Sequence, residues 1–591
     1  MYSGTDFQLK GSVTIRDNYK ASVATGAYDS NTYLYGAAVI KITGDITGSE
    51  INITPSTSGA KTYVTFAEGV EGGAEALACF KIDSNNHNII IDEDGNIEVY
   101  EPYIWNKTDT WNGSIAGNSG GAETVPTSES ILTIHRAVKI PSGYKAVADS
   151  ITTDQFCDII IEDGGELVVN KARSVADVLA KKEIKAATTK NDATGWYLIS
   201  SPAANPNIVS ATNLITTGSQ KYDLYRYNEA ADLQWENYRY KDSLGNAHTY
   251  FDILQDGRGY LYRNNNDYTL NIGGTLHVSD VSCALSYNAT TSPSGAENTL
   301  KGFNIIGNPY SHTIYKGVET EDVHPAIPNG TLLEGKYYVL DAETGKWALT
   351  DDGTAIPPMT GILVQAKSAG TLTMKNSTEG EVVPESKNSR ANGADRKNIW
   401  FTVANSNYED RTCVEFREGH GLNKIEHLNE EAPMLYIRHN NEDFASVDMN
   451  PEAKMFNLNF EAKTMGYYTL SVEPQGEYSY LHLIDKVTEK EIDLLEEQEY
   501  TFIGSTSDAA NRFIVRMSLA EDPEETDNEV FAYQSGDEIV VTGEGELQVF
   551  DVMGRFVATY NVSGVQTVTK PITAGVYIVK LNEKTQKIII K

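Results

Sequence analysis

The sequence has few cysteines, no long apolar run and few long helix-forming stretches. Its four cysteines, Cys79, Cys157, Cys283 and Cys413, lie far apart in 591 residues. They therefore form neither a C-x-x-C motif for a metal or redox centre nor a disulfide scaffold. The strand-like alternation around Cys413 predicts a buried free thiol. Since no segment reaches the roughly 18–20 apolar residues that cross a bilayer as a helix, we predict no transmembrane segment.

Motifs of the common enzyme classes are also missing. No Walker loop, dinucleotide fingerprint or H-E-x-x-H pair occurs. Residues 117–121, GNSGG, match the nucleophile box of serine proteases, but His87 is the only histidine before Ser119. That gap is too short for the second half of a protease double barrel, and the surrounding composition is typical of a loop. We predict no catalytic residue and favour a protein that is not an enzyme.

Negative charge dominates the composition. Acidic residues outnumber basic ones by 82 to 48, which gives a formal net charge of −34. Such a field repels phosphate backbones, so we predict no nucleic-acid partner. The many carboxylates leave Ca²⁺ binding open, but no specific motif supports it, and we predict no cofactor. The acidic segments 92–96 and 162–165 carry the Asp-Gly pairs of tight turns without the ligand spacing of an EF-hand.

Histidines give no convincing metal site. His420 and His427 lie near Glu418 and Glu426 in a loop-like segment. A pair of histidines at helical spacing on a clear helix is missing from the sequence. We therefore predict a solvated cluster at these positions.

The composition favours an all-β, multi-domain fold. The chain is too long for one domain, and its 34 Tyr exceed its 16 Phe and 6 Trp, while helical runs are scarce. Residues 1–172 contain many short β-type runs between Gly, Asp and Asn clusters. They predict a β-solenoid-like (β-helix-like) region, with a β-sandwich as the alternative. In residues 173–185, Ser174 as a cap and apolar side chains on one face predict a short connecting helix.

An internal repeat follows. The segment GWYLISSP in the first copy aligns with GFNIIGNP in the second. Further on, a Tyr-rich strand followed by Trp235 aligns with one followed by Trp347, and each copy ends in two Gly-led strands. This pattern predicts two β modules, residues 195–300 and 301–375, packed against each other.

The last third of the chain divides at polar segments. Residues 376–397 are rich in turn formers and predict a linker. Residues 398–519 alternate between polar and apolar residues and predict a β-sandwich. The acidic hinge 521–527 then precedes a final β-rich unit, residues 528–591.

Three motifs occur in order in this final unit: the turn DVMGR, the strand AGVYIVKL and the basic-apolar end QKIIIK. This arrangement resembles the C-terminal sorting domain (type A) of proteins exported by the type IX secretion system of Gram-negative bacteria. The resemblance covers about the last tenth of the chain and implies an immunoglobulin-like sandwich. The sorting motif that it implies consists of Gly554, Arg555, Gly575, Val576, Tyr577 and Lys587. The two middle modules resemble β modules of large bacterial surface proteins that carry the same sorting domain.

The resemblance implies a location rather than a reaction. Export through the type IX machinery implies an extracellular or outer-membrane-surface protein whose signal peptide is removed. The first residues carry no basic and apolar leader pattern, so we expect that the signal was removed or lies upstream. We predict a non-enzymatic surface protein, adhesive or structural, whose further partner is a host or matrix glycan or protein. The alternative is a secreted carbohydrate-binding protein or polysaccharide-acting enzyme that uses a groove in residues 1–172.

Overall fold

The computed structural model describes most of the chain after residue 125 and short segments before it. The described residues are 2–3, 7–9, 14–15, 19–22, 26–29, 32–34, 40–54, 61–67, 70, 79–82, 88–91, 97–100, 103–105, 116–118, 126–134, 137–153, 159–170, 177–186, 193–208, 211–214, 222–241, 247–330, 332–380, 397–519, 531–535, 538–569, 574–582 and 584–590.

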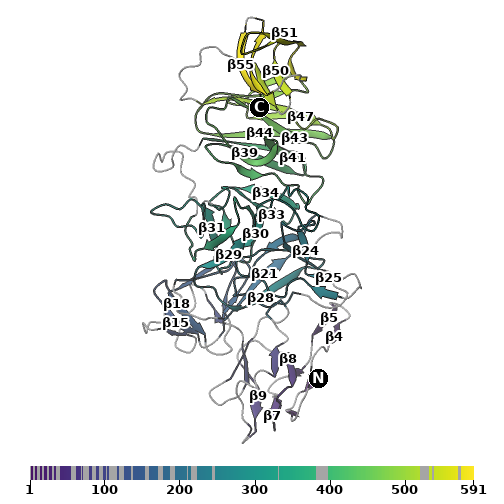
Figure 1. The fold of residues 1–591 in the computed structure, drawn as a ribbon. Coiled ribbons are helices and arrows are strands. Elements are labelled where there is room, and N and C mark those ends of the chain that lie inside the picture. The colour runs from purple at the N-terminus through teal and green to yellow at the C-terminus, as the bar shows by residue number, and fades with distance from the viewer. Residues whose placement is uncertain are drawn as a thin grey trace.

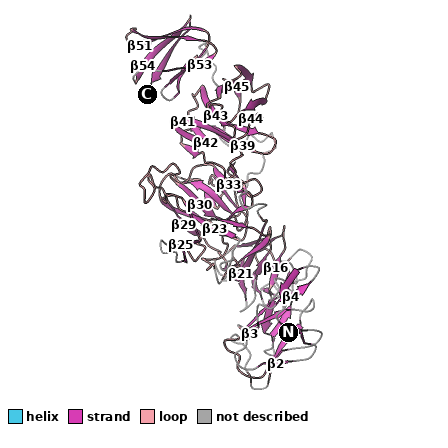
Figure 2. Cartoon of the chain, turned by 90° about the vertical axis from the view of Figure 1, so that its right-hand side faces the viewer, coloured by secondary structure: helices cyan, strands magenta, loops and turns pink. Residues whose placement is uncertain are grey.

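The fold is all-β and multi-domain, as the sequence predicts. Strands make up every regular element in the described residues, and no helix occurs among them (Figure 2). The units form an elongated stack, with the N-terminus at one end and the final unit at the other (Figure 1).

Parallel strand pairs dominate the beginning of the chain. One sheet has the order β1-β6-β8-β10 with β3 on β8, a second has the order β11-β12-β9-β7-β2, and β4 pairs with β5. Their bounds are β1 (Tyr2–Ser3), β2 (Phe7–Leu9), β3 (Thr14–Ile15), β4 (Tyr19–Ser22), β5 (Gly26–Asp29), β6 (Thr32–Leu34), β7 (Ile40–Ile42), β8 (Glu50–Thr54), β9 (Lys61–Phe66), β10 (Phe80–Ile82), β11 (Asn88–Ile91) and β12 (Ile97–Tyr100).

Three further ladders run side by side after residue 102. They are β13-β16-β19-β21-β28, β14-β15-β18 and β17-β20. Their bounds are β13 (Tyr103–Ile104), β14 (Ala116–Asn118), β15 (Ile131–Ile134), β16 (Val138–Ile140), β17 (Lys145–Ala148), β18 (Ser150–Thr153), β19 (Ile159–Ile161), β20 (Glu166–Val169), β21 (Asp177–Ile184) and β28 (Tyr268–Thr275). Val138 pairs in parallel with Ile159, and Lys145 pairs with Glu166 in a neighbouring ladder. Apolar side chains from all three ladders meet in one buried cluster, so the ladders face a common core.

The predicted helix at residues 173–185 is wrong, because residues 177–184 form strand β21. This strand pairs in parallel with β19 on one side and antiparallel with β28 on the other. Val178, Ala180 and Ile184 are buried there. Two ladders of backbone hydrogen bonds and this burial outweigh the local helical preference of the segment. Since β28 belongs to the first repeat, β21 also joins the N-terminal region to that repeat in one sheet.

The two repeats contain four-stranded sheets of the same strand order. Repeat 1 has the order β22-β27-β23-β24, and repeat 2 has the order β30-β36-β33-β34. The bounds are β22 (Trp196–Ile199), β23 (Tyr222–Tyr227), β24 (Trp235–Asn237) and β27 (Tyr260–Asn264), and β30 (Phe303–Gly307), β33 (Tyr337–Asp341), β34 (Lys346–Thr350) and β36 (Gly361–Gln365). The strands that the sequence comparison aligns thus take equivalent places in the two sheets.

Shorter strands complete the repeats. They are β25 (Arg239–Lys241) with β26 (Ala247–Thr249), β29 (Val281–Leu285) with β37 (Gly370–Met374), and β31 (Ile314–Gly317) between β32 (Ile327–Pro328) and β35 (Ala355–Ile356).

Residues 397–519 form one continuous eleven-stranded sheet. Its strands are β38 (Asn398–Ala404), β39 (Glu409–Phe416), β40 (Gly421–Asn423), β41 (Met434–His439), β42 (Glu442–Met449), β43 (Met455–Glu461), β44 (Gly466–Gln475), β45 (Tyr478–Asp485), β46 (Lys490–Asp493), β47 (Glu499–Gly504) and β48 (Phe513–Leu519). Phe401 of β38 lies 5.9 Å from Phe456 of β43, although three strands separate them in the sheet. The sheet therefore curls around one apolar cluster. We call this part the eleven-stranded unit.

The last unit, residues 531–590, has two sheets that share a core. One sheet has the order β49-β50-β53 and the other β52-β51-β54-β55. The bounds are β49 (Ala532–Ser535), β50 (Glu538–Thr542), β51 (Gly545–Asp551), β52 (Phe556–Val562), β53 (Val565–Thr569), β54 (Gly575–Leu581) and β55 (Lys584–Ile590). Val540 packs on Ile484 and Ile514 of the eleven-stranded unit, and Tyr533 donates a hydrogen bond to Asn457 across the same contact. We call this part the terminal unit.

A buried ion pair holds the eleven-stranded unit together. Arg512 donates two hydrogen bonds to Asp485, of 3.0 and 2.8 Å, and both side chains are almost fully buried. Tyr500 donates a further bond to Asp485, and the guanidinium lies 4.4 Å from the Phe502 ring. Because every charge here has partners, removing one of them leaves the other buried and uncompensated.

We expect Arg512→Met to lower the free energy of unfolding by about 3–5 kcal/mol, measured by urea titration. Arg438→Met is the matched control, since Arg438 makes the same two-pronged contact with Asp443 but is more than half exposed. That control should cost about 0–1 kcal/mol. Equal losses in the two variants would contradict the role given to burial.

Candidate functional site

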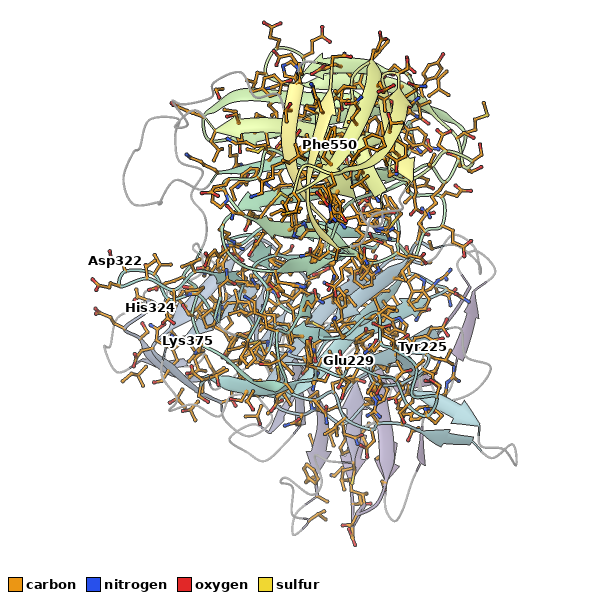
Figure 3. The ribbon with its side chains drawn as sticks, turned by 45° about the horizontal axis from the view of Figure 1, so that its top comes forward. Tyr225, Glu229, Asp322, His324, Lys375 and Phe550 are labelled. Atoms are coloured by element: carbon orange, nitrogen blue, oxygen red, sulfur yellow. The ribbon has the colours of Figure 1, made fainter. Side chains whose placement is uncertain are left out.

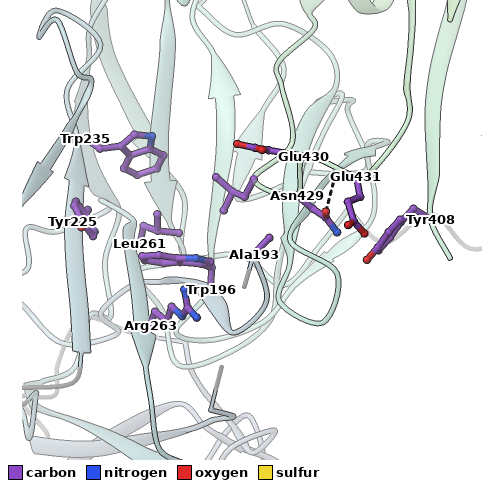
Figure 4. A pocket seen from close by; sticks show the side chains of 11 residues that line it. Ala193, Trp196, Tyr225, Trp235, Leu261, Arg263, Tyr408, Asn429, Glu430 and Glu431 are labelled. Carbon is purple, nitrogen blue, oxygen red and sulfur yellow. Dashed lines mark hydrogen bonds between the residues drawn. The ribbon is translucent and has the colours of Figure 1, made fainter. Parts of the chain in front are cut away.

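A pocket of about 740 Å³ lies between repeat 1 and the eleven-stranded unit (Figure 4). Eleven residues line it: Ala193, Trp196, Tyr225, Trp235, Leu261, Arg263, Tyr408, Leu428, Asn429, Glu430 and Glu431. The first six come from repeat 1 and the loop before it, and the other five come from loops of the eleven-stranded unit. Neither unit builds the pocket alone.

The wall from repeat 1 is aromatic. Trp196, Tyr225 and Trp235 lie on three strands of the same sheet and are only partly buried. The ring centroids of Trp196 and Tyr225 are 5.9 Å apart, and the Arg263 guanidinium lies 5.3 Å from the Trp196 ring. The indole N–H groups of Trp196 and Trp235 donate no hydrogen bond to any other described residue. This wall thus offers flat apolar surfaces together with free hydrogen-bond donors.

The opposite wall is acidic. Glu430 and Glu431 are exposed at its rim, and Tyr408 lies beside them (Figure 4). Asn429 fixes this loop, because its amide donates to the Thr344 carbonyl and its side-chain oxygen accepts the Glu431 N–H. The pocket therefore combines stacking surfaces with carboxylate acceptors about its mouth.

The buried carboxylate of Asp410 lies near the segment that forms the acidic wall and binds several of its neighbours. Asp410 accepts hydrogen bonds of 2.8 and 2.6 Å from Lys424 and one of 2.6 Å from the Leu435 N–H. His427 Nε2 lies 3.3 Å from the same carboxylate. Although burial alone would raise the pKa of Asp410, Lys424 and His427 bring it down to about 2.

The prediction of one solvated histidine cluster is wrong. His427 is buried, and its Nδ1 accepts a 3.0 Å hydrogen bond from the Trp347 N–H of repeat 2. His420 is half exposed and pairs with Glu442 at 3.1 Å. The two histidines are separate because His427 joins the contact between two units, which the local sequence does not reveal.

The contact between repeat 2 and the eleven-stranded unit sets the distance between the pocket walls. Tyr338 donates a 2.8 Å hydrogen bond to the Asn423 carbonyl, and Gln365 exchanges two bonds with the Asn423 side chain and N–H. Around these bonds, apolar side chains of both repeats and of the eleven-stranded unit form one cluster. The partly buried Trp196 and Trp235 lie at its edge.

The pocket aromatics have buried counterparts in repeat 2. Leu198 pairs with Leu261 and Tyr225 pairs with Leu261, while Ile305 pairs with Leu363 and Tyr338 pairs with Leu363. This register makes Phe303, Tyr338 and Trp347 equivalent to Trp196, Tyr225 and Trp235. The members from repeat 2 are buried against the eleven-stranded unit, so the pocket is the part of this repeated aromatic face that stays uncovered.

The predicted sorting residues lie in the four-stranded sheet of the terminal unit. Gly554 has a positive φ of 77° in the turn between β51 and β52. Asp551 holds this turn, because its carboxylate accepts the N–H of Met553 and of Arg555 at 2.9 Å and the Arg555 Nε at 2.6 Å. These hydrogen bonds lower the pKa of Asp551.

Most of the predicted residues meet at one end of this sheet. Tyr577 pairs with both Asp551 and Ile588, while Gly575 and Val576 pair with the last residues of β55. The structure thus places Gly554, Arg555, Gly575, Val576 and Tyr577 at the same end. Lys587 lies one pair further along, opposite Ile578, and is exposed.

This end of the terminal unit also exposes apolar side chains. Met553 is 78% exposed, Phe556 60% and Ile589 58%. Phe556 packs edge-on against Phe550, which is labelled in Figure 3. Such a group of apolar side chains on one surface is typical of a contact site.

The remaining candidate sites in the sequence are the protease-like segment around Ser119 and the two acidic turns. His87, Ser119 and residues 92–96 lie outside the described residues. Residues 162–165 form a tight turn, in which the Gly165 N–H donates to the Glu162 carbonyl, and Lys139 and Lys181 pair with the Glu162 carboxylate.

Two features are missing from the described parts of the chain. There, no group of three or more His, Cys, Asp or Glu side chains is arranged to hold a metal ion, and no helix is long and apolar enough to cross a membrane. Cys79, Cys283 and Cys413 are buried, and Cys413 is a free thiol, which confirms the prediction for this residue.

No pattern in the sequence predicts the pocket. The alignment of the two repeats makes Trp235 and Trp347 equivalent, but nothing in the local sequence separates a tryptophan that lines a pocket from one that is buried. Glu430 and Glu431 lie far along the chain in an acidic loop of ordinary composition. Only the packing of the units brings the two walls together.

Comparison with known proteins adds little. No protein-family model matches the chain, and no curated protein matches it. Among solved structures, the chain is similar to a "Biofilm associated protein - BSP domain" at 9% sequence identity, with 69% of this chain and 98% of that chain covered and a TM-score of 0.14. A TM-score this low carries no argument.

The depressed pKa of Asp410 makes the stability of the eleven-stranded unit depend on acid. Its folded pKa of about 2 lies below the usual value of 3.8, so the stability it contributes is complete above pH 3.8 and is lost as the pH falls towards 2. We expect the difference in unfolding free energy between wild type and Asp410→Asn, measured in urea, to shrink by about 2 kcal/mol over that window. A difference that stays constant from pH 5 to pH 2 would contradict the ionised pair.

Proposed function

We propose that this chain is a non-enzymatic protein of the bacterial cell surface or extracellular space, adhesive or structural, which the type IX secretion system exports by means of the terminal unit. The observation that carries this proposal is the convergence of the three sorting motifs. They are separated in the sequence, yet five of their six residues lie at one end of one small sheet. A secretion system that recognises a folded domain can bind residues that lie close together on its surface, as these five do.

The rest of the molecule fits a role in display. Its units are stacked end to end (Figure 1), and the terminal unit touches the eleven-stranded unit through a small contact around Val540 and Tyr533. The terminal unit has its own core. It is therefore suited to act as a separate tag at the end of a long scaffold.

Deletion of residues 528–591 should leave the protein in the periplasm of a host that has the type IX system, because the recognised surface is gone. Cell fractionation and surface labelling measure this. Lys587→Glu should reduce surface delivery by reversing the charge beside the motif cluster. Lys580→Glu, on the exposed face of β54, is the matched control and should be exported normally. Surface delivery of the truncated chain would refute the sorting role.

We propose further that the pocket between repeat 1 and the eleven-stranded unit binds a neutral saccharide, which would make the adhesion target a glycan. Aromatic rings stack on the C–H faces of sugars, and carboxylates accept hydrogen bonds from hydroxyl groups. Trp196, Trp235, Glu430 and Glu431 supply both kinds of contact. The pocket lies outside residues 1–172, where the sequence had suggested a groove.

The net charge and the Arg263 position favour a neutral ligand. The formal charge of −34 repels acidic glycans at a distance. The Arg263 guanidinium already lies over one face of the Trp196 ring. That face therefore cannot make a cation–π contact with a cationic ligand. An uncharged sugar ring can stack on the tryptophans of one wall and donate hydroxyl hydrogen bonds to the carboxylates of the other.

A glycan array should show binding of the purified chain to neutral oligosaccharides, and Trp235→Ala should weaken it about tenfold, since one stacking contact contributes about 0.5–1.5 kcal/mol. Tyr467→Ala is the control, because Tyr467 is an exposed ring on β44 outside the pocket. Binding that both variants retain at the wild-type level would place the ligand elsewhere.

A further inference from the structure

Repeat 2 contains a buried lysine whose surroundings are unusual. Lys316 lies on β31 and is 0% exposed. Its Nζ donates hydrogen bonds to the side-chain oxygen of Asn329, to the Gly335 carbonyl and, at 3.1 Å, to Asp352 Oδ1. The other oxygen of Asp352 accepts a hydrogen bond from the Asn329 amide nitrogen. One carboxylate therefore bridges an amine and an amide that are themselves in contact.

The backbone holds this triad in place. Lys316 and its neighbour Gly317 pair in parallel with β32, and the Asn329 N–H donates to the Gly317 carbonyl at 2.6 Å. The Gly353 N–H donates to the Lys316 carbonyl at 2.8 Å. All three side chains thus come from segments that are bonded to the same strand, which restricts their relative motion.

We propose that Lys316 and Asn329 join in an intramolecular amide bond, with Asp352 as the catalytic residue that carries the proton. The amine nitrogen attacks Cγ of Asn329, which is bonded to the oxygen that Nζ already contacts. The Nζ–Cγ bond forms, the Cγ–Nδ2 bond breaks, and ammonia leaves. No oxidant or cofactor is needed, because one amide replaces another.

The protons balance through Asp352. The Lys316 ammonium first gives one proton to the Asp352 carboxylate and becomes a neutral nucleophile. Asp352 delivers this proton to the leaving Nδ2, which its own oxygen already contacts. It then accepts the second proton from the attacking nitrogen and passes it to the released ammonia. The products are a secondary amide, an ammonium ion and the restored carboxylate.

The environment favours the neutral amine. Burial lowers the pKa of Lys316 from its ordinary value, and the positive charge of Lys336 acts in the same direction, while Asp352 and Asp351 oppose it. The ring centroid of Tyr337 lies 5.8 Å from Nζ. A buried charge is costly, and conversion into an amide removes it. Lys336 is the informative contrast: it is buried too, but it pairs with two carboxylates, those of Asp351 and Glu415, whereas Lys316 pairs with one, that of Asp352.

Peptide mass spectrometry of the purified full chain tests the bond directly. Trypsin should fail to cut after Lys316, and residues 302–336 should appear as one peptide that is lighter by one ammonia, about 17 Da. Further cleavage after Glu319 or Glu321 should leave two peptides joined by a branch between Lys316 and Asn329. Lys316→Arg and Asp352→Asn should both restore the full mass.

A competing reaction has the same mass change and must be separated. The Asn329-Gly330 pair can close to a succinimide, which also loses ammonia but forms no branch and is cut by hydroxylamine. The proposal is overturned if wild type is cleaved normally after Lys316 at full mass, or if the mass loss persists in Lys316→Arg. Because the wild-type result decides by itself, a variant that fails to fold does not obscure the answer.

Discussion

The shared apolar cluster between the two repeats and the eleven-stranded unit is the contact on which the rest of the structure depends. Strands β38 and β39 are buried on both faces: Ile399 and Phe401 face the core of the eleven-stranded unit, whereas Trp400 and Cys413 face the repeats. This explains why neighbouring residues of β38, such as Ile399, Trp400 and Phe401, are all apolar although their side chains point to opposite faces of the sheet. The polar groups inside the contact are paired, as Lys336 is with Asp351 and Glu415 above the Trp400 ring. Apolar burial of this extent, with its charges satisfied, fixes the two units relative to each other.

Duplication followed by unequal covering then explains the pocket. Both repeats carry the same aromatic face, and the eleven-stranded unit covers only the copy in repeat 2 completely. There Trp347 is buried, and its N–H donates to His427. In repeat 1 the equivalent Trp235 stays partly exposed opposite Glu430 and Glu431. The aromatic face that packs against the eleven-stranded unit in repeat 2 is thus accessible in repeat 1, where this cover ends.

The sequence predicts those features that depend on neighbouring residues. Alternation and turn residues give the all-β fold, and the matching segments of the repeats fall on equivalent strands. The segment at 173–185 shows the limit: its helical pattern is real, but β19 and β28 offer it two rows of backbone partners. The prediction for His427 is wrong for a similar reason: its partners, Trp347 and Asp410, come from other parts of the chain. Contacts between units determine the pocket, and buried charges such as Arg512 and Asp485 pair with residues far away in the sequence, so no local pattern encodes either.

A covalent link at Lys316 would matter because of where it lies. Strands β32 and β35, on either side of β31, have two residues each, so few backbone hydrogen bonds hold this small sheet. If the chain is pulled at its ends, as the proposed role at the cell surface would imply, we expect such a sheet to open before the long ladders of the eleven-stranded unit. An amide between Lys316 and Asn329 closes a short loop across β31 and β32, which limits the unfolded chain and keeps the two strands together after their hydrogen bonds break. The same step removes the charge of a fully buried lysine. The proposed bond would thus strengthen a sheet that has few backbone hydrogen bonds of its own.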